Sequence, residues 1–398
     1  MISKNAPLAG LKVLDLTRVY SGPYCTMMLG DLGAEIIKIE RKGSGDDTRD
    51  FMPVKNGESG YFTYLNRNKK SITLDLKEEK AVQIVKELSR WADIFVENFA
   101  PGVVGRLGIG YEEIKKENPQ IIYGSISGFG QTGPYKSKPA YDVVTQAMGG
   151  FMALTGEKEG KPYKLGPSIV DASAGIHMAF AIMAAVYCRQ VTGQGQFLDV
   201  AMMDTAFSTL ENFVVTKTLT GTAPTRNGNA NLGSAPFNSF RSKDGYVTIA
   251  CANDSLFRKL TNVMGRNDLL DEPKYKSNSL RKINEKDLNI TVEEWTVNYT
   301  TKEIVEMLDE AKIPVGPILG VEELIQDPHL KSRGMLVEIP HPVLGNIVYP
   351  GNPLKFSETS EFRFDSAPLL GEHTDEILEN VLGKSKEDIA ELHNAQIV

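Results

Sequence analysis

The fold is decided first by the stretch Leu11–Glu40, LKVLDLTRVYSGPYCTMMLGDLGAEIIKIE. The apolar character of Leu11–Thr17 and of Glu35–Glu40 predicts two buried strands. Between them, the Ser-Gly-Pro tripeptide at residues 21–23 predicts a turn that leads into a short helix, Gly22–Asp31. Strand, helix and strand in this order predict a βαβ unit whose two strands lie parallel.

The same alternation continues along the first half of the chain. Further strands are expected at Ile72–Leu76, Ile94–Val96, Ile121–Ile126 and Phe197–Met202, and helices at Glu78–Trp91, at Gly110–Glu117, from Asp171 to Cys188, and at Asp204–Lys217. Strands that are separated by helices of this length predict an α/β fold with a doubly wound parallel sheet.

The character of the sequence changes near Leu219. Residues 219–240 are rich in Gly, Asn, Pro, Ser and Thr, and a loop of this length is typical of a lid or of a linker between domains. A strand at Tyr246–Cys251 and several helices follow it. We therefore expect one part at residues 1–218, a loop or linker at 219–240, a smaller domain at 241–325 and a last part at 326–398.

The amino-acid composition limits the kinds of molecule that the protein is expected to bind. The 398-residue chain has 44 Lys and Arg against 51 Asp and Glu, a net charge of −7. Because nucleic acid and anionic membranes attract excess positive charge, neither is expected as a partner. Lys4, Lys12 and Asp15 interrupt the N-terminus where a signal peptide needs an apolar run. The uncharged run Ala172–Cys188 is too short for a bilayer span and predicts a core helix, so a cytoplasmic protein is expected.

Several common kinds of site are not predicted. Cys25, Cys188 and Cys251 are too far apart for a disulfide framework or a CxxC motif, and each is expected to be an inert core thiol. The five histidines lack metal-ligand spacing, so no metal is expected. The turn after the first strand lacks the G-x-G-x-x-G pattern of a dinucleotide site. A doubly wound sheet without these glycines must bind its ligand in another way.

Polar residues at strand ends and helix starts remain as candidates. Asp171 precedes a run of small residues, so it is either a helix N-cap or a carboxylate that acts as a covalent nucleophile on an activated acyl group. We expect two groups of basic residues at one edge of the sheet, Arg41-Lys42 and Arg67–Lys70. Arg49 and Arg106 could join them. These cations are either solvated surface charge or a rim for a phosphorylated ligand.

Seven stretches match one family in order along nearly the whole chain. They are Leu14–Pro23, Gly33–Glu40, Asn66–Lys77, Glu97–Gly102, Val170–His177, Thr192–Gln196 and Pro368–Asp375. Each is weak alone, but together they resemble the family III CoA-transferases. That family includes formyl-CoA:oxalate, carnitine and succinyl-CoA:dicarboxylate CoA-transferases as well as 2-methylacyl-CoA racemases.

The resemblance implies a fold and a set of partners. A Rossmann-like large domain would be built from both chain ends, with a smaller α+β domain between them, and two chains would interlock as a homodimer. The substrates would be an acyl-CoA and a small carboxylic acid. Coenzyme A would enter as part of the substrate, and no permanently bound cofactor is implied.

The resemblance also implies site residues. Asp171 falls on the family nucleophile, which would form a mixed aspartyl anhydride and then an aspartyl-CoA thioester. The loop at 226–240 would act as a lid that excludes water. The positions that match CoA-contacting residues of the family are Tyr20, Ser21, Arg41, Leu74, Asp75, Lys77, Asn98, Phe99, Arg106 and Tyr141.

Two alternatives stay open beside a CoA-transferase. A racemase needs a proton donor–acceptor pair, and racemases of the family place a His where this chain has Tyr141, a poor base at neutral pH. A CoA-binding protein without turnover would require Asp171 to be only an N-cap. Among the transferases, the N-terminal motifs look most like the succinyl-CoA:dicarboxylate branch, so a succinyl-CoA-like donor is expected.

Overall fold

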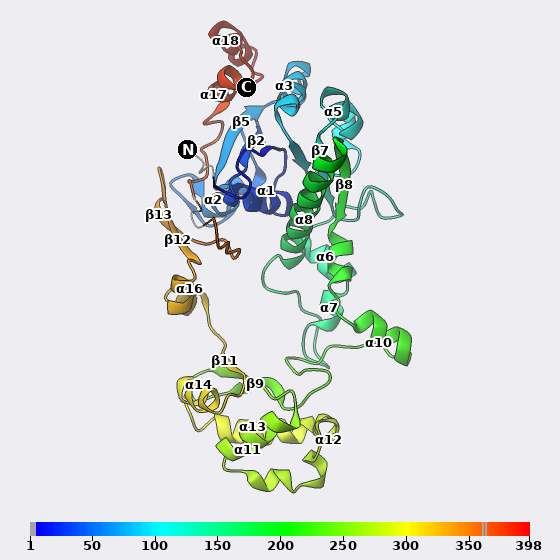
Figure 1. Cartoon of the computed structure of the whole chain (residues 1–398), viewed down its shortest axis with the longest axis vertical. Helices are drawn as coiled ribbons and strands as arrows, with labels where there is room; N and C mark the ends of the chain where they lie inside the picture. Colours follow the sequence, from blue (N-terminus) through cyan, green and yellow to red (C-terminus); the bar gives the residue numbers. More distant parts are fainter. Residues whose placement is uncertain (1–4, 360–361, 363) are drawn as a thin grey trace. The chain divides into compact units, whose positions relative to one another are not determined.

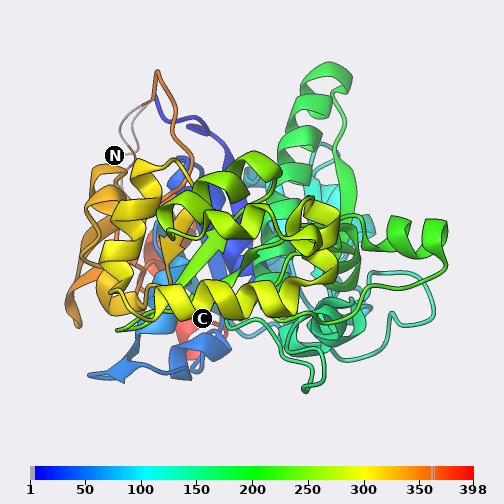
Figure 2. The ribbon, with the colours of Figure 1, turned by 90° about the horizontal axis from the view of Figure 1, so that it is seen from below.

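The computed structural model describes residues 5–359, 362 and 364–398, and the chain forms two compact units (Figure 1). Unit 1 comprises residues 1–151, 164–212 and 329–398, and unit 2 comprises residues 152–163 and 213–328. Unit 1 therefore contains both ends of the chain. Figure 2 gives a second view of the same elements.

A parallel sheet forms the centre of unit 1. In the described part of the chain its strands, in spatial order, are β5 (Lys69–Leu74), β2 (Glu35–Arg41), β1 (Lys12–Asp15), β6 (Ile94–Glu97), β7 (Ile122–Ser127) and β8 (Gln196–Ala201). Leu14 on β1 pairs with Ile37 on one side and Phe95 on the other. The strand order reverses between β1 and β6, and parallel sheets bind ligands in the crevice beyond the carboxyl ends of the strands at such a point. The predicted α/β fold with a parallel sheet is confirmed.

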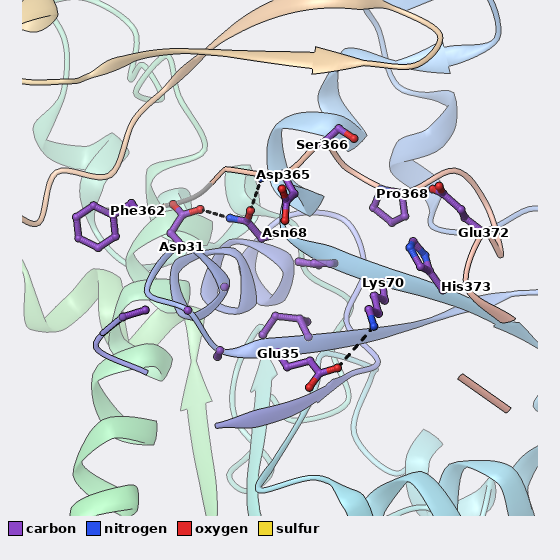
Figure 3. A pocket seen from close by; sticks show the side chains of 16 residues that line it. Asp31, Glu35, Asn68, Lys70, Phe362, Asp365, Ser366, Pro368, Glu372 and His373 are labelled. Atoms are coloured by element: carbon purple, nitrogen blue, oxygen red, sulfur yellow. Dashed lines mark hydrogen bonds and ion pairs between the residues drawn. The ribbon is translucent and has the colours of Figure 1, made fainter. Parts of the chain in front are cut away.

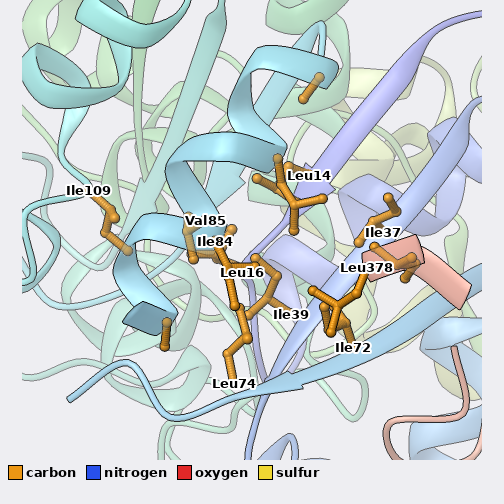
Figure 4. Packing of buried hydrophobic residues seen from close by; sticks show 14 of the residues in the cluster. Leu14, Leu16, Ile37, Ile39, Ile72, Leu74, Ile84, Val85, Ile109 and Leu378 are labelled. Atoms are coloured by element: carbon orange, nitrogen blue, oxygen red, sulfur yellow. The ribbon is translucent and has the colours of Figure 1, made fainter. Parts of the chain in front are cut away.

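Helices from both chain ends cover one face of the sheet. They are α3 (Glu79–Trp91), α5 (Tyr111–Glu117), α17 (Thr374–Asn380) and α18 (Lys386–Asn394). Leu14, Ile37 and Ile72 on the strands share a buried cluster with Val85 on α3 and Leu378 on α17 (Figure 4). Burial of apolar surface by α17 therefore fixes the C-terminal segment against the N-terminal strands.

The opposite face is covered by α1 (Ser21–Asp31), α8 (Ile169–Thr192) and α9 (Met202–Ser208). By length and composition α8 is apolar enough to cross a membrane, a property shared by core helices of globular proteins. Met178 and Ile182 are fully buried in the core of unit 1, whereas Phe180 and Tyr187 are 76% and 71% exposed. The helix therefore has one face in the core of unit 1 and one apolar face that unit 1 leaves open.

Smaller elements complete unit 1. They are the hairpins β3 (Val54–Lys55) with β4 (Glu58–Ser59) and β12 (Leu336–His341) with β13 (Gly345–Pro350), and the helices α2 (Gly60–Asn66), α4 (Val103–Arg106), α6 (Asp142–Met148), α7 (Phe151–Leu154), which continues into unit 2, and α16 (Pro328–Ser332), which begins in unit 2.

Unit 2 is built around an antiparallel sheet. Its strands are β9 (Phe237–Arg241), β10 (Tyr246–Ala250) and β11 (Val315–Pro317), with β10 in the centre. Its helices include α10 (Phe213–Thr220), α11 (Asp254–Val263), α12 (Asn278–Ile283), α13 (Glu285–Thr296), α14 (Thr301–Glu310) and α15 (Val321–Leu324). Val247 and Ile249 on β10 pack with Leu260, Val292 and Leu308 in its core.

The structure corrects three local expectations. The long helix α8 begins at Ile169, so Asp171 is its third residue and not its N-cap. The helix expected at Asp204–Lys217 is interrupted, because α9 ends at Ser208 and α10 begins only at Phe213. Cys188 is exposed on α8 and is not a core thiol, whereas Cys25 and Cys251 are buried as expected.

Candidate active site

Asp171 lies in the first turn of α8, on the side of unit 1 where α1 also begins. The two helices approach closely at Gly175, one turn after Asp171, because a Cβ on Gly175 would meet the carbonyl oxygen of Ser21 at 2.7 Å. The small residue thus brings the β1–α1 turn next to the turn of α8 that carries Asp171. A side chain at position 175 would push the two helix starts apart.

A second carboxylate, Asp142, caps the helix that carries Asp171. Its Oδ1 accepts the backbone N–H of Val170 at 2.9 Å and that of Asp171 at 3.3 Å. Its Oδ2 accepts a hydrogen bond from Gln146 Nε2 at 2.6 Å. Two N–H groups at the start of α8 are therefore satisfied by a residue on α6, and the Asp171 side chain is left available for other contacts.

The surroundings raise the pKa of Asp171 to about 7. The main cause is burial, which penalises the ionised carboxylate, and the second is the negative charge of Asp142. Tyr61 on α2 is close enough for these charges to act on it, and burial together with Asp171 raises the pKa of Tyr61 to about 12. Such a perturbed carboxyl group beside a second carboxylate is typical of functional sites.

A cavity of about 330 Å³ opens beyond the carboxyl ends of β1, β2 and β5. Predicted CoA-contacting residues line it: Arg41, Leu74, Asp75, Lys77 and Phe99. Thr17 and Arg18, which begin the turn toward α1, line it as well. The β1–α1 turn therefore runs from this cavity to the helix start beside Asp171.

Other predicted site residues lie elsewhere. Tyr20 and Ser21 are at the start of α1, and Tyr141 precedes α6 with 72% of its surface exposed. Arg106, at the end of α4, is exposed and is not among the residues that line the cavity. The Asn98 amide is bound on both sides by the main chain of Arg18. Their predicted contacts with CoA stay predictions.

The basic residues are not arranged as the sequence predicted. Lys69 begins β5 at the amino edge of the sheet, opposite the edge where Arg41 ends β2. Arg67 is buried against Asp31 at 2.6 Å. Arg49 likewise pairs with a buried carboxylate, Glu40, at 2.7 Å. Arg49, Arg67 and Lys69 thus form interior ion pairs, which neither the surface-charge nor the cationic-rim interpretation foresaw, while Arg41 and Lys42 line the cavity.

A larger cavity of about 550 Å³ lies at the amino ends of β2 and β5 (Figure 3). Three of its charged side chains already have partners, because Lys70 lies 3.7 Å from Glu35 and Asp31 accepts a hydrogen bond from Asn68 at 2.9 Å. It lies at the edge of the sheet opposite the 330 Å³ cavity, so its size does not make it the catalytic site. Among the described residues, no group of His, Cys, Asp and Glu is arranged to hold a metal ion.

The sequence did not reveal Asp142, Tyr61 or Gly175 as parts of the site. Asp142 is far from Asp171 in the chain, so no local spacing connects the two carboxylates. The one usable signal was Gly175, a glycine inside a helix, which often marks a close approach of backbones.

A parallel sheet with a ligand-sized cavity at its carboxyl edge and a half-buried carboxyl group of raised pKa nearby defines a Rossmann-like protein with an enzyme-type site. The family model of CoA-transferase family III matches residues 8–374. The chain belongs to this family and is a CoA-transferase.

Characterised relatives cover nearly the whole chain. It is 38% identical to the human succinyl-CoA:glutarate CoA-transferase over 98% of this chain and 90% of that protein. It is 42% identical to the acetyl-CoA:oxalate CoA-transferase of Acetobacter aceti over 89% of this chain and 90% of the relative. A crystal structure of a CaiB/BaiF family protein from Brucella suis matches with a TM-score of 0.87 and 37% identity, covering 95% of this chain and all of the other.

Proposed function

We propose that this enzyme moves CoA from a succinyl-CoA-like donor to a small carboxylate or dicarboxylate, with Asp171 as covalent nucleophile. The observation that carries the proposal is the Asp171 carboxyl group, which is half-buried in the first turn of α8 and has its pKa raised to about 7. At neutral pH a large fraction of this group is ionised, and its burial leaves it less solvated than a surface carboxylate.

The chemistry proceeds by exchange of acyl groups on Asp171. The carboxylate attacks the donor thioester carbonyl, the C–S bond breaks, and a mixed anhydride and CoA thiolate form. The thiolate attacks the aspartyl carbonyl of this anhydride, which releases the donor acid and leaves a CoA thioester on Asp171. The acceptor carboxylate repeats these steps in reverse, so Asp171 is regenerated as a carboxylate and CoA leaves on the acceptor.

Support for the CoA site comes from the 330 Å³ cavity. Arg41 and Lys42 at the end of β2 and Lys77 after β5 supply positive charge for phosphate groups on a protein of net charge −7. Leu74 and Phe99 supply apolar surface for the adenine ring. We assign the nucleotide end of CoA to this cavity, with the thioester directed along the β1–α1 turn toward Asp171.

Support for the donor comes from the relatives. The human relative and one from Agrobacterium fabrum, which is 34% identical, both bear names that pair succinate or its CoA ester with glutarate. The proposal has three further parts. The enzyme is a cytoplasmic homodimer of interlocked chains, and the loop at residues 226–240 acts as a lid. Residues 1–218 and 326–398 form a large domain, and residues 241–325 form a smaller one.

The test incubates the enzyme with succinyl-CoA and glutarate, oxalate or other small acids and follows the CoA esters by mass. Wild type is expected to form the acceptor's CoA ester, and hydroxylamine is expected to convert the thioester on Asp171 to a hydroxamate. Asp171→Asn should lower transfer by orders of magnitude, since it removes the nucleophile. The matched control is Asp204→Asn, an exposed aspartate in the first turn of α9, which should keep wild-type activity.

Two results contradict the proposal. Normal transfer by Asp171→Asn excludes the covalent mechanism. Failure of every acid, combined with exchange of the α-proton of a 2-methylacyl-CoA, identifies a racemase.

A further inference from the structure

The turn between β1 and α1 holds its backbone in an unfavourable conformation. Val19 has a φ of 67°, in the left-handed region that β-branched residues rarely adopt. Residues held in such conformations cluster at functional sites, and they persist only where the surroundings fix them. Val19 is followed directly by Tyr20 and Ser21, and α1 begins at Ser21.

Asn98, from the loop after β6, clamps this turn with both ends of its side-chain amide. The Arg18 N–H donates to Asn98 Oδ1 at 2.9 Å, and Asn98 Nδ2 donates to the Arg18 carbonyl oxygen at 2.7 Å. Both groups of one residue's backbone are thus satisfied by a single side chain. Each of these bonds uses one of the amide's two N–H donors or one of its two acceptor lone pairs, and both are directed at the Arg18 backbone.

Asp46, from the loop after β2, holds the next residue. Its Oδ1 accepts the Val19 N–H at 3.2 Å, and Lys38 Nζ donates to its Oδ2 at 2.9 Å. Lys38 Nζ also donates to the Thr17 carbonyl oxygen at 2.7 Å. Side chains from two further segments therefore bind the backbone on both sides of Arg18.

Because the β1–α1 turn is held in this way, it fixes the position of the start of α1 next to Asp171. A Cβ on Gly175, one helical turn after Asp171, would come within 2.7 Å of the Ser21 carbonyl oxygen, so the two helices touch backbone to backbone at this point. The Tyr20 ring contacts that of Tyr61, with centroids 6.2 Å apart, and Tyr61 feels the charge of Asp171. A shift of the turn would therefore move groups that surround the reacting carboxylate.

We propose that Asn98 and Asp46 are positioning residues that hold the strained Arg18–Val19 turn in place for catalysis at Asp171, and that the Asn98 side chain acts on the reaction through this turn. The inference rests on the proposed function. Displacements near 1 Å at a reacting group cost large factors in rate, so loss of the clamp should lower kcat more than it weakens CoA binding.

The test measures kcat, KM and the dissociation constant of CoA for Asn98→Ala. We expect kcat to fall by about tenfold or more, and the CoA dissociation constant to rise by a clearly smaller factor, because Thr17 and Arg18 of the turn also line the cavity. Asn98→Asp keeps the acceptor for the Arg18 N–H but sets a carboxylate oxygen against the Arg18 carbonyl oxygen, so it should also lower kcat. Adding Val19→Gly to Asn98→Ala should restore part of kcat, because glycine adopts this φ without strain.

The matched control is Asn118→Ala, since the Asn118 amide also binds backbone carbonyls, those of Ser89 and Ala92, but at the amino edge of the sheet. It should keep wild-type kcat. The inference is overturned if Asn98→Ala leaves kcat unchanged and weakens CoA binding, or if it only lowers thermal stability as the control does. A wild type without any transfer activity would instead contradict the proposed function, which separates the two failures.

Discussion

Unit 1 contains a fully buried aspartate, Asp15, and a half-buried one, Asp171, in opposite surroundings. Asp15, at the end of β1, accepts hydrogen bonds from Lys69 Nζ at 3.0 Å and Thr26 Oγ1 at 2.7 Å. Burial alone would raise the pKa of Asp15, but Lys69, Lys38 and the threonine hydroxyls together lower it well below its usual range. Asp171, by contrast, has another carboxylate beside it, and its pKa rises to about 7.

The difference separates structural from chemical carboxylates. A carboxylate that is stabilised by a lysine and by hydroxyl groups is a weak nucleophile and base, because any reaction would give up those interactions. A carboxylate destabilised by burial and by a like charge is ready to react. Glu40 belongs to the first kind, because Arg49, Lys38 and Ser71 outweigh its burial and lower its pKa. Asp31 lies between the two, because burial raises its pKa even though Arg67 pairs with it at 2.6 Å. Asp171 belongs to the second.

The largest effect on stability is expected when the ion pair between Asp15 and Lys69 is broken. Lys69→Met leaves Asp15 buried without its main partner, so the free energy of unfolding should fall by about 3–5 kcal/mol. Urea unfolding followed by circular dichroism measures the change. Lys70→Met is the control, because Lys70 is 38% exposed and pairs at the surface, and it should cost at most about 1 kcal/mol. Equal losses in the two variants would show that the Asp15 pair is not special.

At Asp171 we expect a substitution to increase the stability of the fold and not to lower it. Its folded pKa lies above that of the unfolded chain, so it stabilises the fold at low pH, and that stabilisation is lost as the pH rises through about 7. Asp171→Asn has no such loss. At pH 8 the variant should be more stable than wild type by about 2 kcal/mol, an amount that allows for the partial exposure of Asp171, and the gap should shrink at pH 5.

Thermal unfolding at the two pH values checks this prediction, with Asp204→Asn as the control. A gap that does not depend on pH, or a variant less stable than wild type at pH 8, would show that burial does not strain the Asp171 carboxylate. Lys69→Met should lower the free energy of unfolding, whereas Asp171→Asn should raise it at pH 8. This difference distinguishes the two kinds of carboxylate.

The sequence could predict what depends on local pattern. The strands of the sheet follow from apolar runs such as Glu35–Glu40. The position of Asp171 near a helix start makes it a candidate, but that pattern leaves an N-cap and a nucleophile open, and only the family resemblance favours the nucleophile. The pairing of Lys69 with Asp15 could not be predicted, because it depends on which strands lie side by side. The same holds for Asp142 and Asp171, whose contact exists only after α6 and α8 have packed.

The smallest expected effect tests the like charge at Asp171. Asp142→Asn keeps an oxygen that can accept the Val170 N–H but removes the negative charge, so the pKa of Asp171 should fall by about one unit or less. In wild type, kcat/KM should rise with pH and level off above about 7, because only ionised Asp171 attacks the thioester.

In Asp142→Asn the same profile should level off at lower pH, and this shift is a readout that loss of helix capping alone does not produce. Gln146→Leu is the matched control, since it removes the amide that contacts Asp142 and leaves both charges in place. If the profile of Asp142→Asn keeps its midpoint, burial alone sets the pKa of Asp171. Asp142 would then act only through its hydrogen bonds to the backbone of α8. The pKa values of Asp15 and Asp171 would differ because Asp171 lacks a neighbouring lysine, and not because Asp171 has a neighbouring carboxylate.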